Sequence, residues 1–478
     1  MDNKFYITTP IYYINDKPHI GHAYTTIAAD VLARWRFGQG EDVTFSTGVD
    51  ENAQKTVDAA AKHNEEIHAY TDRMAGIWES TWEKLGISNT DFIRTTEPRH
   101  AEVVSDFWKR MEAAGDIYRG KYEGWYCTAC ETFYKEEDLV SDGLCPIHKT
   151  KPEWVSEENY YFALSKYQQP LLDFYAAHED FVAPAYRFNE IKSFVERGLE
   201  DVSFSREKKP WGIPVPDDPD QVIYVWADAL VNYITVMGGI EGWEQHPADI
   251  HMMAKEIARF HAIIWPAMLM SAGLPLPGQI VVHGFFTIDG VKISKSLGNV
   301  IDPLDMAERY GIDALRYFLL REIPFGEDGD FSETKLKDRY NSDLANGLGN
   351  FAARILALAE KEELKKGKLD SAFELEIQKM QQTVFLKTKE YRFHEALAAV
   401  WAAIAFGDRY LNNEAVWAIK DDEDRRKKLF NLISLLDNVA AVLLPFIPES
   451  SRKITAAIQW EDDTLHAKKI APLFPRIA

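Results

Sequence analysis

Cysteine is scarce in this sequence, with three residues among 478. A small, odd number of cysteines excludes a disulfide scaffold and favours a reducing compartment. Long apolar runs are also missing, because the most apolar stretch, residues 263–276, is interrupted by Pro266, Gly273 and Pro275. This stretch is too short and too broken to cross a bilayer. No basic segment or long apolar run precedes Phe5, so we expect no signal peptide, no membrane partner and a cytoplasmic location.

Positive charge is in deficit, with 54 basic against 75 acidic residues and a net charge of −21. Since phosphate contact rewards positive charge, this balance argues against a general nucleic-acid binder, although one local basic surface can still bind RNA. Repeats and low-complexity tracts are absent, and 46% apolar residues indicate a globular protein. A chain of this length exceeds one ordinary core, so we expect two or three domains.

Short β-prone runs alternate with helical patterns in the first part of the chain. Residues 5–8, 43–47, 222–226 and 280–283 are expected as strands, and residues 23–37 and 51–63 as helices. This alternation predicts an α/β fold with a doubly wound parallel sheet of the Rossmann type. We expect its halves at residues 1–97 and 222–339, split by an insertion over residues 98–221.

The tail has a different pattern, with no convincing strand from residue 340 onward. Apolar residues recur there at helical spacing: Leu344, Leu348, Phe351, Ile355 and Leu358, then Leu429, Ile433, Leu436, Val439 and Leu443. The charged stretch 421–428 is expected to be a solvated loop or a helix start. The pattern predicts an all-α helical bundle over residues 340–478 as a separate domain.

A candidate phosphate site follows the first expected strand, at Pro18-His19-Ile20-Gly21-His22. A helix N-terminus offers unpaired N–H groups and a positive dipole end. Gly21 permits close approach of a nucleotide, and His19 and His22 can donate to phosphate oxygens. Alone, the motif is also what two polar loop histidines would produce.

A second candidate lies at Asp289-Gly290-Val291-Lys292-Ile293-Ser294-Lys295-Ser296. Asp-Gly is a hairpin signal, and the lysines and serines beyond it can close over a triphosphate. A solvated basic loop would look the same in isolation. Together, the two motifs resemble the HIGH and KMSKS signatures of class I aminoacyl-tRNA synthetases, with Ile293 in place of Met. That resemblance implies an adenylate-forming site in a Rossmann-type catalytic domain.

The resemblance narrows to methionyl-tRNA synthetases and covers nearly the whole chain. Four further stretches carry it: Thr9-Pro10-Ile11-Tyr12-Tyr13, Thr47-Gly48-Val49-Asp50-Glu51, Tyr224-Val225-Trp226-Ala227-Asp228, and residues 259–266 from Arg259 through His261 to Pro266. It implies that Ile11, Tyr13, Asp50, Trp226 and His261 line a methionine pocket. Asp50 can pair with the α-ammonium group, and aromatic walls favour the thioether sulfur. Core packing for Trp226 and a satisfied buried histidine for His261 are the alternatives.

Two departures from the family pattern stand near these residues. The family usually continues Asp-Glu with His-Gly, whereas this sequence has Asn52 and Ala53. The family's Gly-Lys-Asp near the ATP ribose is Ala254-Lys255-Glu256 here. Glu256 can still accept a hydrogen bond from a ribose hydroxyl.

All three cysteines belong to one motif inside the insertion. Cys127 and Cys130 are followed, after fourteen residues, by Cys145 and His148. Three thiolates and one imidazole at this spacing predict a tetrahedral zinc knuckle. A closed four-ligand site leaves no position for substrate, so the zinc should be structural. A knuckle without metal is the alternative.

The resemblance implies that the helical tail reads the tRNA anticodon through Asn350, Arg354 and Trp417. Asn350 and Arg354 are four residues apart, hence on one helix face, and Trp417 can stack on a splayed base. Val416 replaces the usual Pro before that tryptophan. A surface Asn/Arg pair and a core tryptophan are the alternatives. Without an appended tRNA-binding or dimerising module, we expect a monomer.

The expected partners are ATP, L-methionine and tRNA(Met), with Mg²⁺ carried by ATP. The resemblance implies that ATP is bound by seven residues, His19, Gly21, His22, Glu256, Lys292, Ser294 and Lys295, and that four of them, His19, His22, Lys292 and Lys295, are catalytic. Charge developing during adenylate formation would be stabilised by His19, His22, Lys292 and Lys295. Another class I ligase, a related nucleotidyltransferase without tRNA, and a tRNA-binding protein that has lost catalysis remain as alternatives.

Overall fold

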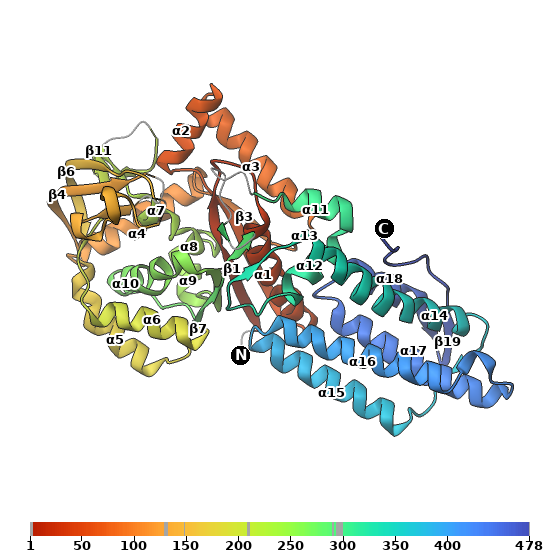
Figure 1. The fold of residues 1–478 in the computed structure, drawn as a ribbon. Helices are drawn as coiled ribbons and strands as arrows, with labels where there is room; N and C mark the ends of the chain where they lie inside the picture. The colour runs from red at the N-terminus through yellow and green to blue at the C-terminus, as the bar shows by residue number, and fades with distance from the viewer. Residues whose placement is uncertain are drawn as a thin grey trace. The chain divides into compact units, whose positions relative to one another are not determined.

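The computed structural model describes residues 3–128, 132–147, 149–207, 211–288, 291–292 and 300–477. The chain forms two compact units (Figure 1). The first comprises Met1–Pro18 and Arg36–His283, and the second comprises His19–Trp35 and Gly284–Ala478. Among the helices of these described segments, none is long and apolar enough to traverse a membrane.

A six-stranded parallel sheet lies at the centre of the first unit. Its order is β3 (Asp91–Arg94), β2 (Asp42–Asp50), β1 (Lys4–Tyr13), β12 (Ile250–Ala254), β13 (Gln279–His283) and β7 (Val182–Ala183). Every neighbouring pair is parallel. Residues on both faces of β1, β12 and β13 are buried, as expected of a parallel sheet covered on two sides. The predicted parallel α/β sheet is therefore confirmed.

Strand register places functional side chains at one edge of this sheet. In the pairing of β1 with β2, Tyr13 lies opposite Asp50 and Ile11 opposite Gly48. On its other side, Gly48 lies opposite Ile93 of β3, and a Cβ at Gly48 would stand 2.1 Å from the Ile93 carbonyl oxygen. Only glycine lets β2 approach β3 this closely.

The prediction that residues 222–226 form a strand of the parallel sheet is wrong. Residues 222–226 end β11 (Asp218–Ile223) and begin helix α7 (Val225–Ala229). β11 pairs antiparallel with β9 (Ser205–Glu207) and β10 (Pro214–Val215), away from the parallel sheet. A short apolar run fits a strand or a buried helix equally well, so its pattern could not decide. The place in the sheet belongs to β12, for which no strand was predicted.

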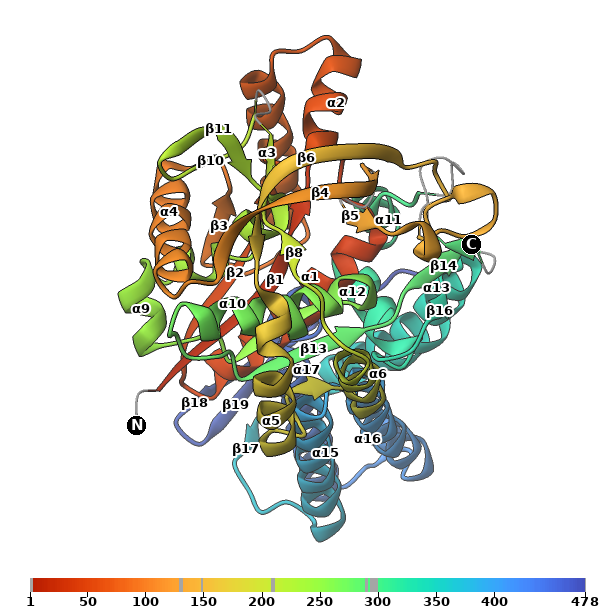
Figure 2. The ribbon, with the colours of Figure 1, turned by 90° about the vertical axis from the view of Figure 1, so that its left-hand side faces the viewer.

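The insertion carries a long antiparallel ribbon, β4 (Ile117–Cys127) against β6 (Glu153–Phe162), flanked by β5 (Thr132–Tyr134) and β8 (Val202–Ser203) (Figure 2). Besides α7, the helices of the first unit are α2 (Gln54–His63), α3 (Ile67–Lys84), α4 (Pro98–Ala113), α5 (Gln168–Ala177), α6 (Ala185–Glu196), α8 (Asn232–Val236), α9 (Ile240–Gln245) and α10 (Trp265–Ser271). The last residues of α1 (Ile20–Gly38), from Arg36 onward, also belong to this unit. Its shorter turns are η1 (Glu136–Asp138), η2 (Ser141–Gly143), η3 (Leu164–Tyr167), η4 (Lys255–Ile257) and the π-helix η5 (Phe260–Ile264). Helices α4, α5, α6, α8, α9 and α10 contribute buried residues to one core that includes Trp108, Trp243 and Trp265.

The second unit is mainly helical, which confirms the predicted helical tail. Its helices are α11 (Pro303–Tyr310), α12 (Ile312–Arg321), α13 (Glu333–Arg339), the π-helix η7 (Tyr340–Gly349), α14 (Asn350–Ala359), α15 (Ser371–Lys389), α16 (Phe393–Asn413), η8 (Val416–Ala418), α17 (Asp422–Leu443) and α18 (Pro448–Ala457). A small sheet contains β14 (Phe286–Ile288), β15 (Val291–Lys292) and β16 (Gly329–Asp330). The charged stretch after residue 420 is a helix start, because the Asp421 carboxylate caps α17.

The expectation that the tail lacks strands is wrong. β17 (Leu364–Lys365), β19 (Thr464–Ala467) and β18 (Ile458–Glu461) form a three-stranded antiparallel sheet. These strands have two to four residues, and Asp462 in the connecting turn adopts a left-handed φ of 52°. Segments this short carry too little alternation to be recognised, and tertiary contacts decide their conformation.

A buried ion pair holds the second unit together. The Arg316 guanidinium of α12 lies 2.6 Å from the Asp30 carboxylate, and both side chains are fully buried. Arg316 also donates to the carbonyl oxygens of Pro445 and Phe446, at 2.9 and 2.8 Å. These contacts attach residues 19–35 and the segment that follows α17 to α12. Removing either charge would leave its partner buried and uncompensated.

Candidate active site

Four of the residues expected to bind an amino acid come together within the first unit. Tyr13 and Asp50 are neighbours at the carboxyl ends of β1 and β2. The Tyr13 and Trp226 rings meet edge to face with centroids 6.4 Å apart, and the Trp226 and His261 rings meet likewise at 6.2 Å. Ile11 is half-buried and lies two residues before Tyr13 in β1. Ligands of open α/β sheets bind beyond the carboxyl ends of the strands, where this cluster lies.

Trp226 is more than a core residue. Its indole is only partly buried and stacks on Phe260, with ring centroids 3.8 Å apart and planes inclined by 8°. The indole Nε1 is buried and has no hydrogen-bond partner among the described residues. Phe260 was not predicted as a site residue, although it directly precedes His261 in the sequence. The stack fixes the plane of the indole, and the indole face that does not contact Phe260 is left for other contacts.

His261 is held as a neutral imidazole. Its Nδ1 lies 3.0 Å from the Ile257 carbonyl oxygen and its Nε2 lies 2.7 Å from the Tyr233 hydroxyl. Because a carbonyl only accepts, Nδ1 carries the proton, and Nε2 accepts from Tyr233. Burial lowers the pKa of His261 to about 4. Tyr233, which orients this ring, was not predicted from the sequence.

A second buried histidine supports the first. His251 of β12 accepts from the Trp265 indole at 3.2 Å through Nε2, and its Nδ1 lies 2.7 Å from the Thr8 hydroxyl. Burial lowers the pKa of His251 well below its ordinary value. The His251 ring lies 4.2 Å from the Tyr233 ring, centroid to centroid. Two neutral imidazoles and a tyrosine thus form a packed layer without a net charge.

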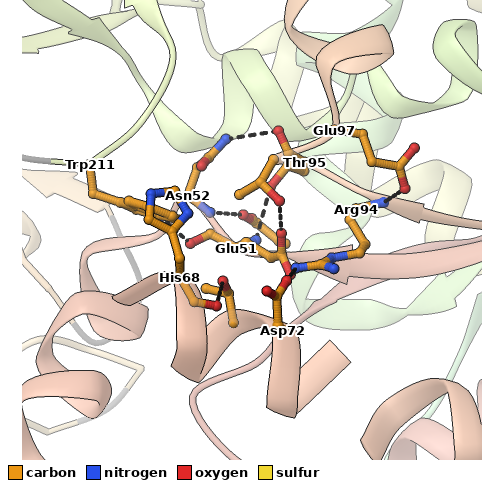
Figure 3. Close-up of polar contacts among 11 residues, drawn as sticks. Glu51, Asn52, His68, Asp72, Arg94, Thr95, Glu97 and Trp211 are labelled. Atoms are coloured by element: carbon orange, nitrogen blue, oxygen red, sulfur yellow. Dashed lines mark hydrogen bonds and ion pairs between the residues drawn. The ribbon is translucent and has the colours of Figure 1, made fainter. Parts of the chain in front are cut away.

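The loop after β2 surrounds Asp50 with hydrogen-bonded groups. Asp50 is 3% exposed, and the backbone N–H of Asn52 donates to its Oδ1 at 3.2 Å. The next carboxylate, Glu51, is fully buried and accepts from Arg94 Nε at 2.9 Å and from the Thr96 hydroxyl (Figure 3). Burial raises the pKa of the Glu51 carboxyl, and the contacts with Thr96 and Arg94 oppose that rise.

The histidines of the first motif lie at the start of the second unit, with His19 directly before α1 and His22 in its first turn. Their rings stack, with centroids 3.6 Å apart. The His19 N–H donates to His22 Nδ1, and the Gly21 N–H donates to His19 Nδ1, both at 3.1 Å. Since both Nδ1 atoms accept, the ring protons lie on the two Nε2 atoms. A Cβ at Gly21 would lie 3.0 Å from the His19 ring and disturb this arrangement.

The second motif is only partly described. Lys292 stands in β15 opposite Thr287 of β14, and Ile288 pairs with Val291, as expected of strands joined by a hairpin. Ser294 and Lys295 lie outside the described residues. Glu256 is exposed in η4, directly after Ala254 ends β12 at the carboxyl edge of the sheet.

Two of the expected metal ligands are described, and both are buried. Cys127 ends β4, and its Sγ lies 3.4 Å from the Thr150 hydroxyl. The Cys145 N–H donates to the Thr150 carbonyl oxygen at 2.8 Å. Thr150 therefore lies beside both cysteines and brings the two ends of the motif together. Cys130 and His148 lie outside the described residues.

The expected RNA-reading residues lie on the surface of the tail. Trp417 is 52% exposed, which excludes the core alternative. The Arg354 guanidinium lies 5.5 Å from the Trp417 ring centroid and donates to Asp408 at 2.8 Å and to Asn412 at 2.7 Å. Asn350 is exposed at the start of α14 and lines a groove of about 570 Å³. Asp408 and Asn412, which orient Arg354, were not predicted.

Known proteins resemble the chain over nearly its whole length. Residues 5–149 and 137–356 match the family described as class I tRNA synthetases (M), and residues 360–475 match the anticodon binding domain of methionyl tRNA ligase. The methionine–tRNA ligase of Thermotoga maritima is 45% identical over 480 residues, covering 96% of this chain and 76% of the relative. That of Rickettsia conorii is 44% identical over 471 residues, covering 95% of this chain and 92% of the relative.

Solved structures agree with the sequence comparison. Methionyl-tRNA synthetase from Mycobacterium tuberculosis in complex with methionyl-adenylate superposes with a TM-score of 0.94 and 38% identity, covering 99% of this chain and all of the other. The apo form of the same protein superposes with a TM-score of 0.85 and 36% identity, covering 99% of this chain and 98% of the other.

The low pKa of His261 predicts acid sensitivity. The ordinary pKa of a histidine is 6.5, so in the unfolded chain His261 becomes protonated below about pH 6.5. In the folded chain it becomes protonated only near pH 4. The free energy of unfolding should therefore decrease as the pH is lowered through this range. Between about pH 7 and pH 5, His261 alone should account for a decrease of about 2 kcal/mol. His251 acts in the same direction.

Urea unfolding of the wild type and His261→Gln at both pH values measures the effect of His261. The variant should lose about 2 kcal/mol less than the wild type on acidification. His178→Gln, which changes an exposed ring, serves as the control. The same loss in the wild type and His261→Gln would contradict the prediction.

Proposed function

The chain belongs to the methionyl-tRNA synthetases of class I and has methionine–tRNA ligase activity, and we propose from this premise which of its residues carry each step. Methionine is bound by one group of side chains: Ile11, Tyr13, Asp50, Trp226 and His261. The observation that supports this assignment most is the β1–β2 register, which sets Tyr13 beside Asp50 at the carboxyl edge of the sheet.

The pocket separates the two ends of the amino acid. Asp50 pairs with the α-ammonium group, and the Tyr13, Trp226 and His261 rings receive the thioether, whose polarizable sulfur favours aromatic contacts. A neutral His261 suits both ends, because it neither repels the ammonium nor places a charge against the apolar side chain.

Adenylate formation rests on groups that stabilise the phosphates. We assign ATP binding to His19, Gly21, His22, Glu256, Lys292, Ser294 and Lys295. The methionine carboxylate attacks the α-phosphorus and pyrophosphate leaves, while the Nε2–H groups of His19 and His22 and the two lysines donate to the developing charge. Mg²⁺ that accompanies ATP would neutralise part of the triphosphate charge. The terminal ribose 2′-hydroxyl of tRNA then attacks the adenylate carbonyl carbon and releases AMP.

The insertion is proposed to hold one structural zinc ion through Cys127, Cys130, Cys145 and His148. The donor set fits zinc, because three thiolates and an imidazole satisfy a tetrahedral ion. The burial of Cys127 and Cys145 and their shared neighbour Thr150 support the proposal.

The domain division is also proposed. Catalytic halves over residues 1–97 and 222–339 flank the insertion over residues 98–221, and residues 340–478 read the anticodon. Exposure of Asn350 and Trp417, and the orientation of Arg354 beside Trp417, support the last assignment.

Lys295→Ala should slow adenylate formation while leaving methionine affinity nearly intact. Losing one donor to developing charge costs about 2.7–4 kcal/mol, or roughly 10²–10³ in rate. Stopped-flow measurement of adenylate formation gives the rate, and calorimetry gives the methionine affinity. Lys361→Ala, at an exposed lysine of the same unit, is the control. An unchanged rate in Lys295→Ala would remove this lysine from the mechanism.

Trp417→Ala should impair tRNA charging alone. Stacking on an aromatic platform contributes about 1–3 kcal/mol per base, so kcat/KM for tRNA should fall roughly 5- to 150-fold. Methionine-dependent pyrophosphate exchange needs no tRNA and should stay near the wild-type rate. The matched control is Trp460→Ala, at another partly exposed tryptophan of the tail. Equal losses of charging and exchange would favour a structural role for Trp417.

Purified protein should contain about one zinc ion per chain, measured by elemental analysis. Cys145→Ser should abolish stoichiometric zinc and make Cys127 reactive toward an alkylating agent, because the metal no longer covers its thiolate. A wild-type protein without metal, whose thiols react as fast as those of the variant, would refute the zinc proposal.

A further inference from the structure

The peptide unit between Glu51 and Asn52 is held from both sides. Its N–H donates to Asp50 Oδ1 at 3.2 Å, and its carbonyl oxygen accepts from the Trp211 indole Nε1 at 2.7 Å. The N–H and C=O of a trans peptide point in opposite directions, so the two bonds together fix the orientation of the peptide plane. Asp50 thus receives its hydrogen bond from a group that cannot easily rotate.

The Asn52 side chain is anchored as firmly as its backbone. Its Nδ2 donates to the Thr95 carbonyl oxygen at 3.3 Å (Figure 3). It also donates to Asp228 Oδ2 at 2.6 Å. Because both partners can only accept from an amide nitrogen, they also determine which way the amide faces. Rotation of Asn52 would remove one hydrogen bond from the buried Asp228 carboxylate, which is 1% exposed.

The second carboxylate oxygen of Asp228 is also held, by a hydrogen bond with His100. Asp228 Oδ1 accepts from His100 Nε2 at 2.7 Å, and His100 Nδ1 lies 2.9 Å from the Thr235 hydroxyl. His100 is fully buried in α4, and Thr235 belongs to α8. The chain of contacts therefore runs from two helices through Asp228 to Asn52, and on to Asp50.

Trp211 anchors the opposite side of the peptide. Its ring packs edge to face on His68 of α3, with centroids 4.8 Å apart (Figure 3). The Thr71 hydroxyl of the same helix donates to the His68 carbonyl oxygen at 3.0 Å. Trp211 precedes β10, so a segment far from β2 in the sequence reaches the loop that follows Asp50.

We propose that Asn52 and Trp211 are positioning residues that orient the Asp50 carboxylate toward the α-ammonium group of methionine. This inference rests on the proposed role of Asp50. A charge pair within a buried site depends steeply on geometry, so a carboxylate held by a fixed N–H discriminates between ligands with and without an ammonium group. Neither residue needs to touch methionine for this effect.

The test is the ratio of two dissociation constants, for L-methionine and for 4-(methylthio)butanoic acid, which lacks the amine. Calorimetry on the full chain measures both for the wild type, Asn52→Ala, Trp211→Phe and Asp50→Asn. Trp211→Phe keeps a smaller aromatic ring at this position and removes the indole N–H. Each positioning variant should lose about tenfold of the preference for methionine, with the affinity for the amine-free acid unchanged.

Matched controls separate positioning from folding. Asn89→Ala removes a half-buried amide that donates to the Asp91 carbonyl oxygen at 3.3 Å, and Trp154→Phe changes an exposed indole. Both should keep the wild-type ratio. Equal weakening of the two ligands in Asn52→Ala or Trp211→Phe would show a merely structural role and overturn the inference.

The outcome for Asp50→Asn distinguishes a failure of the positioning role from a failure of the proposed role of Asp50. If this variant loses the preference for methionine while Asn52→Ala and Trp211→Phe keep it, the inference fails and the proposed function stands. If Asp50→Asn keeps the preference, Asp50 is not the ammonium partner and both fail.

Discussion

Parallel pairing of β1 with β2, with Tyr13 opposite Asp50, is the constraint on which the proposed amino-acid site depends. Side chains alternate between the faces of a sheet, so a slip of one residue would carry Tyr13 to the other face while Asp50 stayed in place. Close approach of Gly48 to Ile93 brings β3 against β2 in the same register. Backbone hydrogen bonds thus determine the spacing of an aromatic ring and a carboxylate before any ligand arrives.

Buried polar side chains keep this edge rigid without filling it with charge. His251 and His261 are held neutral by burial, and each has both ring nitrogens within hydrogen-bond distance of a partner. In a medium of low dielectric, an unpaired charge near Asp50 would compete with the ammonium of a substrate. The aromatic layer therefore contributes shape and orientation, and Asp50 is the carboxylate that we propose as the partner of the ammonium group.

The contacts and burial of Asn52 and Ala53 explain how the structure accommodates these two departures from the family pattern. Asn52 is shorter than histidine, and its amide supplies two donors, which Asp228 and the Thr95 carbonyl oxygen accept. Ala53 is fully buried in the core, where its methyl group packs in place of the glycine hydrogen. The loop after Asp50 thus uses a compact hydrogen-bonded arrangement. Glu256 is exposed in η4, directly after β12 ends.

The order of the nucleotide motifs, the helical periodicity of the tail, and strands β1, β2 and β13 could be predicted from the sequence, because these features depend on contiguous or regularly spaced residues. Two features could not be predicted and depend on packing: residues 222–226 end one strand and begin a helix, and β17, β18 and β19 form a sheet. The tertiary structure also decided the contacts of His261 with Tyr233 and of Asp228 with His100, the latter pair 128 residues apart. Hydrogen-bond partners at such separations leave no local pattern, because they are selected by packing rather than by neighbours in the chain.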